Sequence, residues 1–503
     1  MKYLVLVCLT AFTSFCSNAQ AIKKMPQKTN GNSTIEKKSV NTTNTGRNIA
    51  ITLKPYKKKW VYLGSYFGKG KTLSDSAFLD ENSKGFFKGK SKLTAGIYFV
   101  VSPSYSILFE VLMDDKQQFS IVADTLNLQE VSITGSLDND LFKDYSQFSA
   151  IKGKALTEMN EAYTKLQNTN KVEAEKLRKD IQKANQELQS YRQNIIQKYP
   201  KSLLTTLFNT MKQPETPAIP IVNGKADSSY PYRYVKDHYW DDVAFNDDRL
   251  LRTPFFEPKL DNYFKYYVPA DPDSIFSEIK YMLLYARTGK EMYPYLLTKF
   301  TNKYINPEFM GQDKVFVKLF EEFYAKGDTI YLNAASRKTI VERAYSLMAN
   351  QIGNPAPILE LTGEDGKQKS LYDIKGKFTL IVFWDPSCGD CKEEIPRVDS
   401  MYKAKWKSLD VKLFSVNVSI AANTNEDLKK FVEEKKFSAD WLYTHQTKAA
   451  RDAEQKAGLP NFRQLYDVFK TPTLYLLDEK KQIIAKQLTL EQFDDLITAK
   501  LKK

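Results

Sequence analysis

Residues 379–391 read Thr-Leu-Ile-Val-Phe-Trp-Asp-Pro-Ser-Cys-Gly-Asp-Cys, and this stretch decides the fold of the C-terminal third of the chain. Thr379 to Trp384 is an apolar run of strand length. A short loop follows, and a helical pattern then begins at Cys388 and continues to about Trp406. The stretch therefore predicts a strand, a loop and a helix whose first turn carries both cysteines.

The position of the two cysteines at a helix start points to thiol chemistry. A thiolate is the nucleophile in disulfide exchange, and a helix N-terminus stabilises it through unpaired amide groups and the helix dipole. We therefore expect Cys388 to attack a partner disulfide. Cys391, one turn further in, is placed to resolve the mixed disulfide and to form the Cys388–Cys391 disulfide.

Other uses of a Cys-x-x-Cys pair fit this chain less well. Cys8 and Cys16 lie in the N-terminal segment, so a four-ligand zinc site would have to recruit His238 and His445 or carboxylates. A structural disulfide over so short a loop stabilises little. A peroxidase would need a single cysteine flanked by proline and threonine, and the residues before Cys388 do not match. We expect no metal and no cofactor.

The residues around this stretch predict an α/β domain over 351–503, after a boundary at the Gly- and Pro-rich residues 353–357. Beyond the first strand and helix, the pattern predicts a strand, a helix, a hairpin and a closing helix. The predicted ranges are 411–418 for the strand, 426–435 for the helix, 473–477 and 482–485 for the hairpin, and 490–501 for the closing helix.

Two further modules precede this domain. Residues 48–136 contain β-branched and aromatic runs at 96–101, 107–112, 119–122 and 131–133, which predict a β-sandwich-like module. Residues 137–350 are mainly helical. Apolar residues from Leu177 to Ile195 recur at steps of three and four, which predicts an amphipathic helix that packs within the module rather than an intermolecular coiled coil. An aromatic cluster at 230–240 is either a recognition surface or ordinary packing, and we expect packing.

The N-terminus predicts export. Lys2 precedes an apolar stretch that is too short to span a bilayer, and small residues at 17 and 19 favour cleavage before Gln20. We therefore expect a signal peptide at 1–19 and a flexible polar tether at 20–47. A lipoprotein anchored at Cys16 fits less well, because Phe15 occupies the position where such processing wants a small residue. The net charge of +14 comes from scattered lysines, which we interpret as solvated faces with no nucleic-acid partner.

A set of positions over about 352–503 has the spacing of a known group. The positions are Ala356-Pro357, Gly366, Leu371, Gly376-Lys377, Phe383-Trp384, the Cys-Gly-Asp-Cys motif, Glu394, Pro396 and Thr471-Pro472-Thr473. Together they resemble the TlpA/ResA group of envelope thioredoxins. The two upstream modules resemble accessory domains that precede such thioredoxins in envelope proteins of certain Gram-negative bacteria, and the resemblance carries over no activity for them.

The resemblance implies roles for further residues. Pro472 would be the cis-proline that faces the cysteines, and with Thr471 it would bind the substrate chain, with Trp384 packed beside the site. Glu394 resembles the acidic residue that tunes thiol ionisation in this group. Val382 stands where cytoplasmic thioredoxins have a buried aspartate, which leaves Glu394 as the better proton-transfer candidate.

The combined expectation is a periplasmic thiol–disulfide oxidoreductase that works in the reducing direction. Its partners would be protein disulfides or haem-binding thiols, and its electron donor a membrane thiol reductant. The alternative is a binding protein in which the first 350 residues capture a ligand or polypeptide and the thioredoxin domain only supports them.

Overall fold

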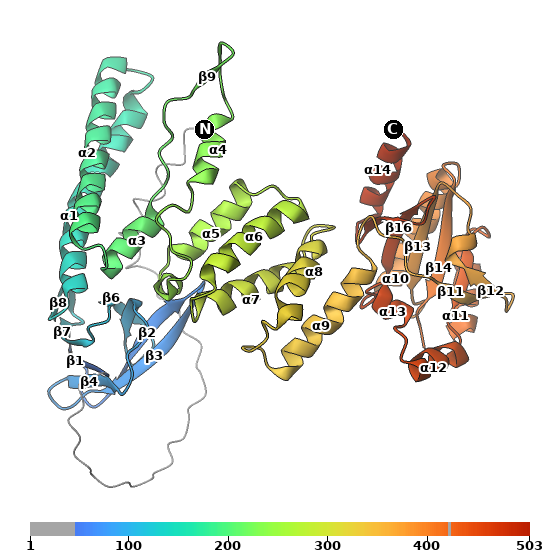
Figure 1. Ribbon diagram of the computed structural model, residues 1–503, viewed down its shortest axis with the longest axis horizontal. Coiled ribbons are helices and arrows are strands. Elements are labelled where there is room, and N and C mark those ends of the chain that lie inside the picture. Colours follow the sequence, from blue (N-terminus) through green and yellow to red (C-terminus); the bar gives the residue numbers. More distant parts are fainter. Residues whose placement is uncertain (1–45, 421–423, 503) are drawn as a thin grey trace, which may run out of the picture. The chain divides into compact units, whose positions relative to one another are not determined.

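A computed structural model describes residues 46–420 and 424–502 (Figure 1). The expected signal peptide and residues 20–45 of the expected tether lie outside the described residues. The described chain forms two compact units, of which the first contains residues up to Val268 together with Met282–Tyr293. The second contains Pro269–Tyr281 together with the chain from Pro294 onward, so it combines helices of the central region with the C-terminal α/β domain.

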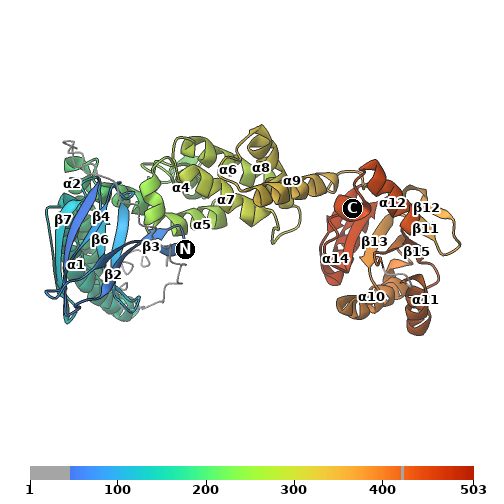
Figure 2. The same cartoon turned by 90° about the horizontal axis from the view of Figure 1, so that it is seen from below.

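The first unit begins with two four-stranded sheets that face each other, as the β-rich composition predicts (Figure 2). One sheet has the order β4-β1-β7-β8 and contains β1 (Arg47–Lys54), β4 (Lys84–Gly89), β7 (Gln118–Asp124) and β8 (Asn127–Thr134). The other has the order β3-β2-β5-β6 and contains β2 (Trp60–Phe67), β3 (Gly70–Phe78), β5 (Gly96–Val101) and β6 (Ile107–Met113). Alternate residues such as Ile49 and Ile51 of β1 meet Leu63 and Val100 in the shared core, because side chains alternate between the faces of a strand.

Helices cover the outer face of the second sheet. The elements of this part are α1 (Leu137–Leu166), α2 (Lys171–Lys198), α3 (Leu203–Met211), α4 (Tyr230–Asp237), α5 (Phe256–Tyr266), the 3₁₀ helix η2 (Asp248–Arg252) and the short strands β9 (Ile221–Val222) and β10 (Lys225–Ala226). Phe99 of β5 packs with Tyr145 of α1 and Leu207 of α3 in one core, which explains why every residue of β5 is buried. The sandwich and these helices therefore share a hydrophobic core.

The amphipathic stripe of α2 packs inside the first unit, as predicted. Ala184 and Leu188 of α2 lie against Leu156 of α1.

The aromatic residues at 230–240 lie partly in the core and partly on the surface. Tyr239 is buried and its hydroxyl donates to the Lys259 carbonyl at 3.0 Å, whereas α4 has no buried residue.

The helices that follow are α6 (Pro272–Ala286), α7 (Met292–Tyr304), α8 (Asp313–Glu322), the 3₁₀ helix η3 (Tyr324–Lys326) and α9 (Ala334–Ala349). Asn333 caps α9, since its side chain accepts from the Ser336 amide at 2.8 Å. Asn350 ends the same helix, and its side-chain nitrogen donates to two backbone carbonyls, one of them in the α/β domain. Helix α9 therefore connects the helical region directly to the α/β domain.

The α/β domain is built on a seven-stranded sheet with the order β12-β11-β15-β14-β13-β16-β17 (Figure 1). Its strands are β11 (Glu360–Gly363), β12 (Gln368–Ser370), β13 (Phe378–Trp384), β14 (Val411–Asn417), β15 (Leu442–His445), β16 (Thr473–Asp478) and β17 (Ile483–Lys486). Its helices are η4 (Leu371–Asp373), α10 (Gly389–Met401), η5 (Tyr402–Trp406), α11 (Thr424–Lys435), α12 (Lys448–Ala457), α13 (Phe462–Leu465) and α14 (Leu490–Leu501). The predicted strands, hairpin and closing helix of this domain are confirmed.

Strand β13 is buried on both faces, which its unbroken apolar run predicts. Val382 and Trp384 point into the core formed with α10, α11 and α14. Ile381 and Phe383 point into the opposite core, which contains Phe462 of α13. The strand therefore runs through the centre of the domain, and the cysteines follow directly after its C-terminal end.

Candidate active site

The cysteines meet a distant loop because of the strand register. β13 and β16 are antiparallel, and Phe383 pairs with Thr473, so the end of β13 lies beside the start of β16. Cys388 follows β13 and Thr471 precedes β16. The Cys388 Sγ donates to the Thr471 carbonyl oxygen at 3.5 Å across 83 residues of sequence. The Thr471–Pro472 bond is cis, as the resemblance implied.

A tight turn fixes the approach to Cys388. The Asp385 carboxylate accepts from the Ser387 amide at 2.8 Å and from the Ser387 hydroxyl at 2.6 Å. The Cys388 amide donates to the Asp385 carbonyl at 3.0 Å. Sequence reasoning did not single out this role for Asp385, although Asp-Pro-Ser is a recognisable turn signal. Cys388 then takes the N-cap position of α10 in an extended backbone conformation.

The two thiols occupy different environments. Cys388 is partly exposed, whereas Cys391 is fully buried in the core beneath α10, and both are free cysteines. The Thr471 side chain and the backbone amides at the start of α10 lower the pKa of Cys388 below its ordinary value. Burial raises the pKa of Cys391 to about 12. The site therefore holds one thiol ready to ionise and one kept protonated.

This difference predicts selective alkylation. At pH 8, a thiol with a pKa of about 12 is ionised to roughly one part in ten thousand. Iodoacetamide at pH 7–8 should therefore label Cys388 and leave Cys391 unlabelled until the protein unfolds. Peptide mass spectrometry after brief labelling measures both sites, with labelling in denaturant as the control. Equal labelling of both cysteines in the folded protein would contradict the assignment.

Trp384 lies beside the cysteines on the buried side. Its side chain is fully buried in the same core as Cys391, and its Nε1 donates to the Ser415 hydroxyl at 2.7 Å. Thr471 and Pro472 are by contrast partly exposed. A part for Trp384 in substrate binding would therefore be indirect, through the packing of Cys391, whereas Thr471 and Pro472 are open to a partner.

Glu394 lies one turn beyond Cys391 and is paired with an arginine. Its carboxylate contacts the Arg397 guanidinium at 2.5 Å with 40% of its side chain exposed, and Arg397 also contacts Glu491 at 2.6 Å. The hydrogen bonds that shift the pKa values of the cysteines come from Thr471, from the backbone of Asp385 and Asp390, and from the two cysteines themselves. Glu394 therefore lies on the same helix as the cysteines, but its carboxylate pairs with Arg397 rather than with either thiol.

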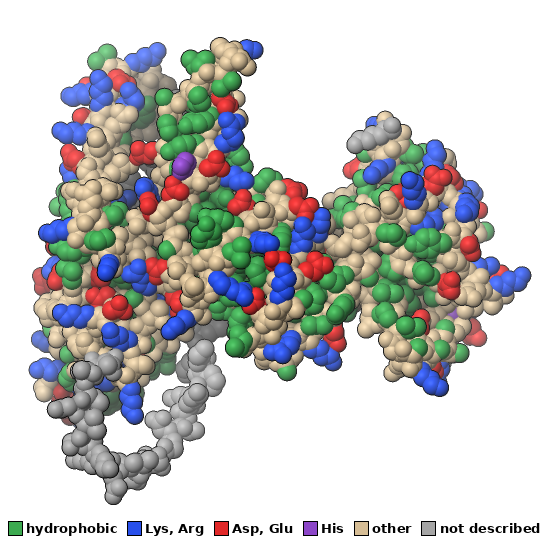
Figure 3. All heavy atoms as spheres, in the orientation of Figure 1, with side chains coloured by type: hydrophobic (Ala, Val, Ile, Leu, Met, Phe, Trp, Pro, Cys, Tyr) green, Lys and Arg blue, Asp and Glu red, His purple; other side chains and the backbone are tan. Residues whose placement is uncertain are grey.

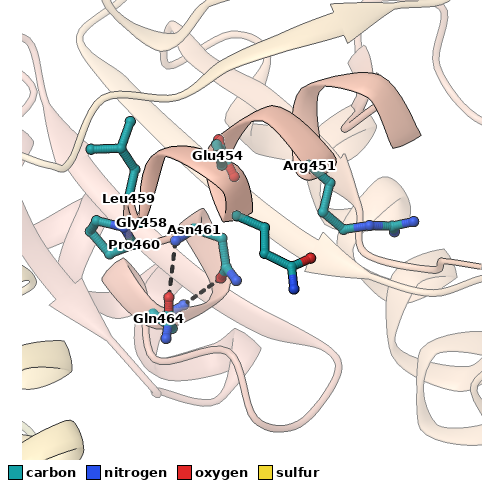
Figure 4. A pocket seen from close by; sticks show the side chains of 8 residues that line it. Arg451, Glu454, Gly458, Leu459, Pro460, Asn461 and Gln464 are labelled. Carbon is teal, nitrogen blue, oxygen red and sulfur yellow. Dashed lines mark hydrogen bonds between the residues drawn. The ribbon is translucent and has the colours of Figure 1, made fainter.

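An open hollow of about 550 Å³ lies elsewhere on the α/β domain, between α12 and α13 (Figure 4). Its lining includes Arg451, Glu454 and Leu459 but neither cysteine. Asn461 and Gln464 on its floor are held by their mutual capping hydrogen bonds. Across residues 46–420 and 424–502, no group of three or more His, Cys, Asp or Glu side chains could hold a metal ion.

Two separate stretches of the chain match known family models. Residues 352–486 match the AhpC/TSA family, and residues 165–344 match a domain of unknown function, DUF5106. The chain is 29% identical over 153 residues to the thiol–disulfide oxidoreductase ResA of Bacillus thuringiensis, which covers 30% of this chain and 78% of that protein. It is 28% identical over 173 residues to ResA of Geobacillus kaustophilus, which covers 34% and 84%.

A solved thioredoxin-like protein from Bacteroides caccae is also similar, with 21% identity and a TM-score of 0.43 over 57% of this chain and 99% of that chain. The family match and the ResA relatives define the class of the C-terminal domain as thioredoxin-like thiol–disulfide oxidoreductase. These matches support a TlpA/ResA-like protein of the thioredoxin superfamily with additional N-terminal domains.

Proposed function

We propose that this oxidoreductase reduces disulfides of partner proteins through Cys388 and Cys391. The observation that supports it best is the pairing of a partly exposed Cys388 at the start of α10 with the Thr471 carbonyl of the cis-proline loop. A partly exposed thiol with a lowered pKa beside the partly exposed Thr471 and Pro472 is what attack on a partner disulfide requires.

In the first step the Cys388 thiolate attacks one sulfur of the partner disulfide. A new S–S bond joins Cys388 to the partner, the partner's disulfide breaks, and its second sulfur leaves as a thiolate that takes up a proton. Thr471 and Pro472 would lie along the partner chain during this step. The buried Cys391 stays protonated and does not compete with Cys388, because its pKa is about 12.

In the second step Cys391 attacks the mixed disulfide. Cys388 no longer carries a charge once it is bonded to the partner, so one of the influences that raise the pKa of Cys391 is removed. Cys391 loses its proton, bonds to Cys388 and releases the partner sulfur. Two electrons have then moved to the partner, and the Cys388–Cys391 disulfide must be reduced by an external dithiol.

We propose the cell envelope, in particular the periplasm, as the place of action, with a membrane thiol reductant as the electron donor. The leader-like sequence at 1–19 supports export. None of the helices in the described part of the chain is long and apolar enough to cross a membrane.

Partner disulfides or haem-binding thiols remain the proposed substrates. Lysine and arginine side chains are interspersed with acidic ones on the face in Figure 3.

We propose that Glu394 tunes thiol ionisation, and its substitution tests this. Replacing Glu394 with glutamine removes a negative charge near the thiols, which should lower an apparent cysteine pKa. The pH dependence of alkylation measures the shift. Glu393→Gln is the matched control, because Glu393 is the exposed neighbour on the same helix. Identical alkylation profiles for wild type and Glu394→Gln would show that Glu394 does not tune thiol ionisation and only forms its ion pair with Arg397.

The direction of electron flow is tested by the redox state of the cysteine pair in cells. Acid quenching and maleimide labelling separate the dithiol from the disulfide form. The proposal expects a reduced pair in normal cells and an oxidised pair when the candidate membrane reductant is deleted. A pair that is oxidised in normal cells and insensitive to the deletion would indicate an oxidant rather than a reductant.

A further inference from the structure

Helix α9 holds the segment that leads to the cis-proline. The Asn350 side chain donates to the Leu465 carbonyl at 2.9 Å. The Arg343 guanidinium forms an ion pair with Asp467, and it also lies 5.2 Å from the centre of the Phe469 ring. Residues 465–469 therefore receive three contacts from α9 and its C-cap residue Asn350, and this segment ends two residues before Thr471.

Arg343 is itself anchored on the helical side. Its Nη2 donates to Asn306 Oδ1 at 2.9 Å, and its Nε and Nη2 lie 3.4 Å from the Ile305 carbonyl. These residues follow α7, so the guanidinium bridges the helical region and the α/β domain. A planar guanidinium presents five donors in a fixed fork, so it can reach acceptors on both sides at once.

Asp467 depends on this arginine. Its side chain is 2% exposed and that of Arg343 is 13% exposed, so the carboxylate is held away from water. A buried carboxylate is costly without a paired cation. The Asp467 backbone has φ of 54°, in the left-handed region, and this residue sets the direction in which the chain leaves α13.

We propose that Arg343 is a positioning residue for disulfide exchange: by fixing Asp467 and Phe469 it sets where Thr471 lies against Cys388. The inference rests on the proposed role of Cys388 as the attacking thiol. Only Lys470 separates Phe469 from Thr471, so a shift of the held segment passes directly to the atom that Cys388 contacts. Arg343 lies within the region that matches the domain of unknown function, which gives that region a role in the thiol chemistry.

The test is the pH profile of Cys388 alkylation in the full chain. The hydrogen bonds that act on Cys388 come from Thr471, Cys391 and Asp390, and Arg343→Gln changes none of these residues. If the segment is released, the Thr471 side chain, whose hydrogen bond lowers the pKa of Cys388, moves away, and the alkylation midpoint moves upward. We expect a shift of about half a pH unit, which corresponds to roughly threefold slower labelling below the midpoint. Arg337→Gln is the control, since Arg337 is an exposed arginine on the same helix whose Nη2 donates to the Thr329 carbonyl at 3.3 Å.

Phe469→Leu is the second variant, because it keeps the ion pair and the fold. Phe469 is 74% exposed, so its loss costs little core packing, yet it removes the ring that the guanidinium covers. An upward shift in this variant supports the inference even if Arg343→Gln fails to fold. Profiles that coincide with wild type in every folded variant would overturn it. Labelling of Cys388 no faster than Cys391 in the wild type would instead contradict the proposed function.

Discussion

Replacing Cys388 with serine is expected to abolish disulfide exchange completely while leaving the fold intact. An alcohol cannot form a mixed disulfide, so no step of the reaction can begin. Cys388 is partly exposed at the N-cap of α10, where serine is a favourable residue, so the helix should keep its start. Turnover of insulin or another model disulfide with dithiothreitol measures the loss, and circular dichroism checks the fold.

Cys391→Ser is the matched variant, with the same chemical change one turn further along. It should also lose steady-state turnover, but it should retain the first half-reaction and release one partner thiol per protein. A stopped assay with a chromogenic aromatic disulfide separates the two variants. Appreciable turnover by Cys388→Ser, or a first half-reaction that depends on Cys391 instead, would reverse the assigned roles.

Replacing Asp313 with alanine is expected to destabilise the second unit by about 3–5 kcal/mol. The Lys486 ammonium contacts Asp313 at 2.7 Å, with side-chain exposures of 3% and 5%. Burial lowers the pKa of Lys486 despite this partner, so the lysine already carries a desolvation cost. Without Asp313 the ammonium keeps only oxygens of Asn350, at 2.9 and 2.5 Å, among the contacts of the described chain. Urea unfolding of the full chain measures the change.

Asp273→Ala provides the control for this prediction. Asp273 also pairs with lysines, Lys314 at 2.9 Å and Lys318 at 2.5 Å, but its side chain is 57% exposed, so its loss should cost far less stability than the loss of Asp313. Replacing both buried partners, in Asp313→Leu with Lys486→Met, should recover most of the lost stability, because no charge is left buried. A loss for Asp313→Ala as small as that for Asp273→Ala would show that the buried pair does not hold the α/β domain to the helices.

The strands and helices of the α/β domain could be predicted from the sequence because each follows from a pattern of neighbouring residues. The apolar run before Cys388, the hairpin at 473–485 and the closing helix at 490–501 each follow from patterns within a few residues. The meeting of Cys388 with Thr471 required the resemblance, since the strand order is a property of the whole sheet.

The contacts that tie the helices to the α/β domain had no signal in the sequence. Asp313 and Lys486 are 173 residues apart, and each stands in a pattern where a charged residue predicts a solvated face. The same applies to Arg343 and Asp467. The domain boundary at 350/351 therefore remains a proposal, and a fragment that starts at 351 would lack Asp313, Arg343 and Asn350.

The central claim is that Cys388 attacks partner disulfides and Cys391 resolves them, and covalent trapping in cells tests it most directly. Cys391→Ser should accumulate mixed disulfides through Cys388, seen on non-reducing gels as bands that dithiothreitol removes and mass spectrometry identifies. Cys388→Ser should accumulate few, because its remaining thiol is buried with a raised pKa. If neither variant traps a partner while non-covalent pull-down through the first 350 residues still recovers one, the chain is a binding protein and the account is wrong.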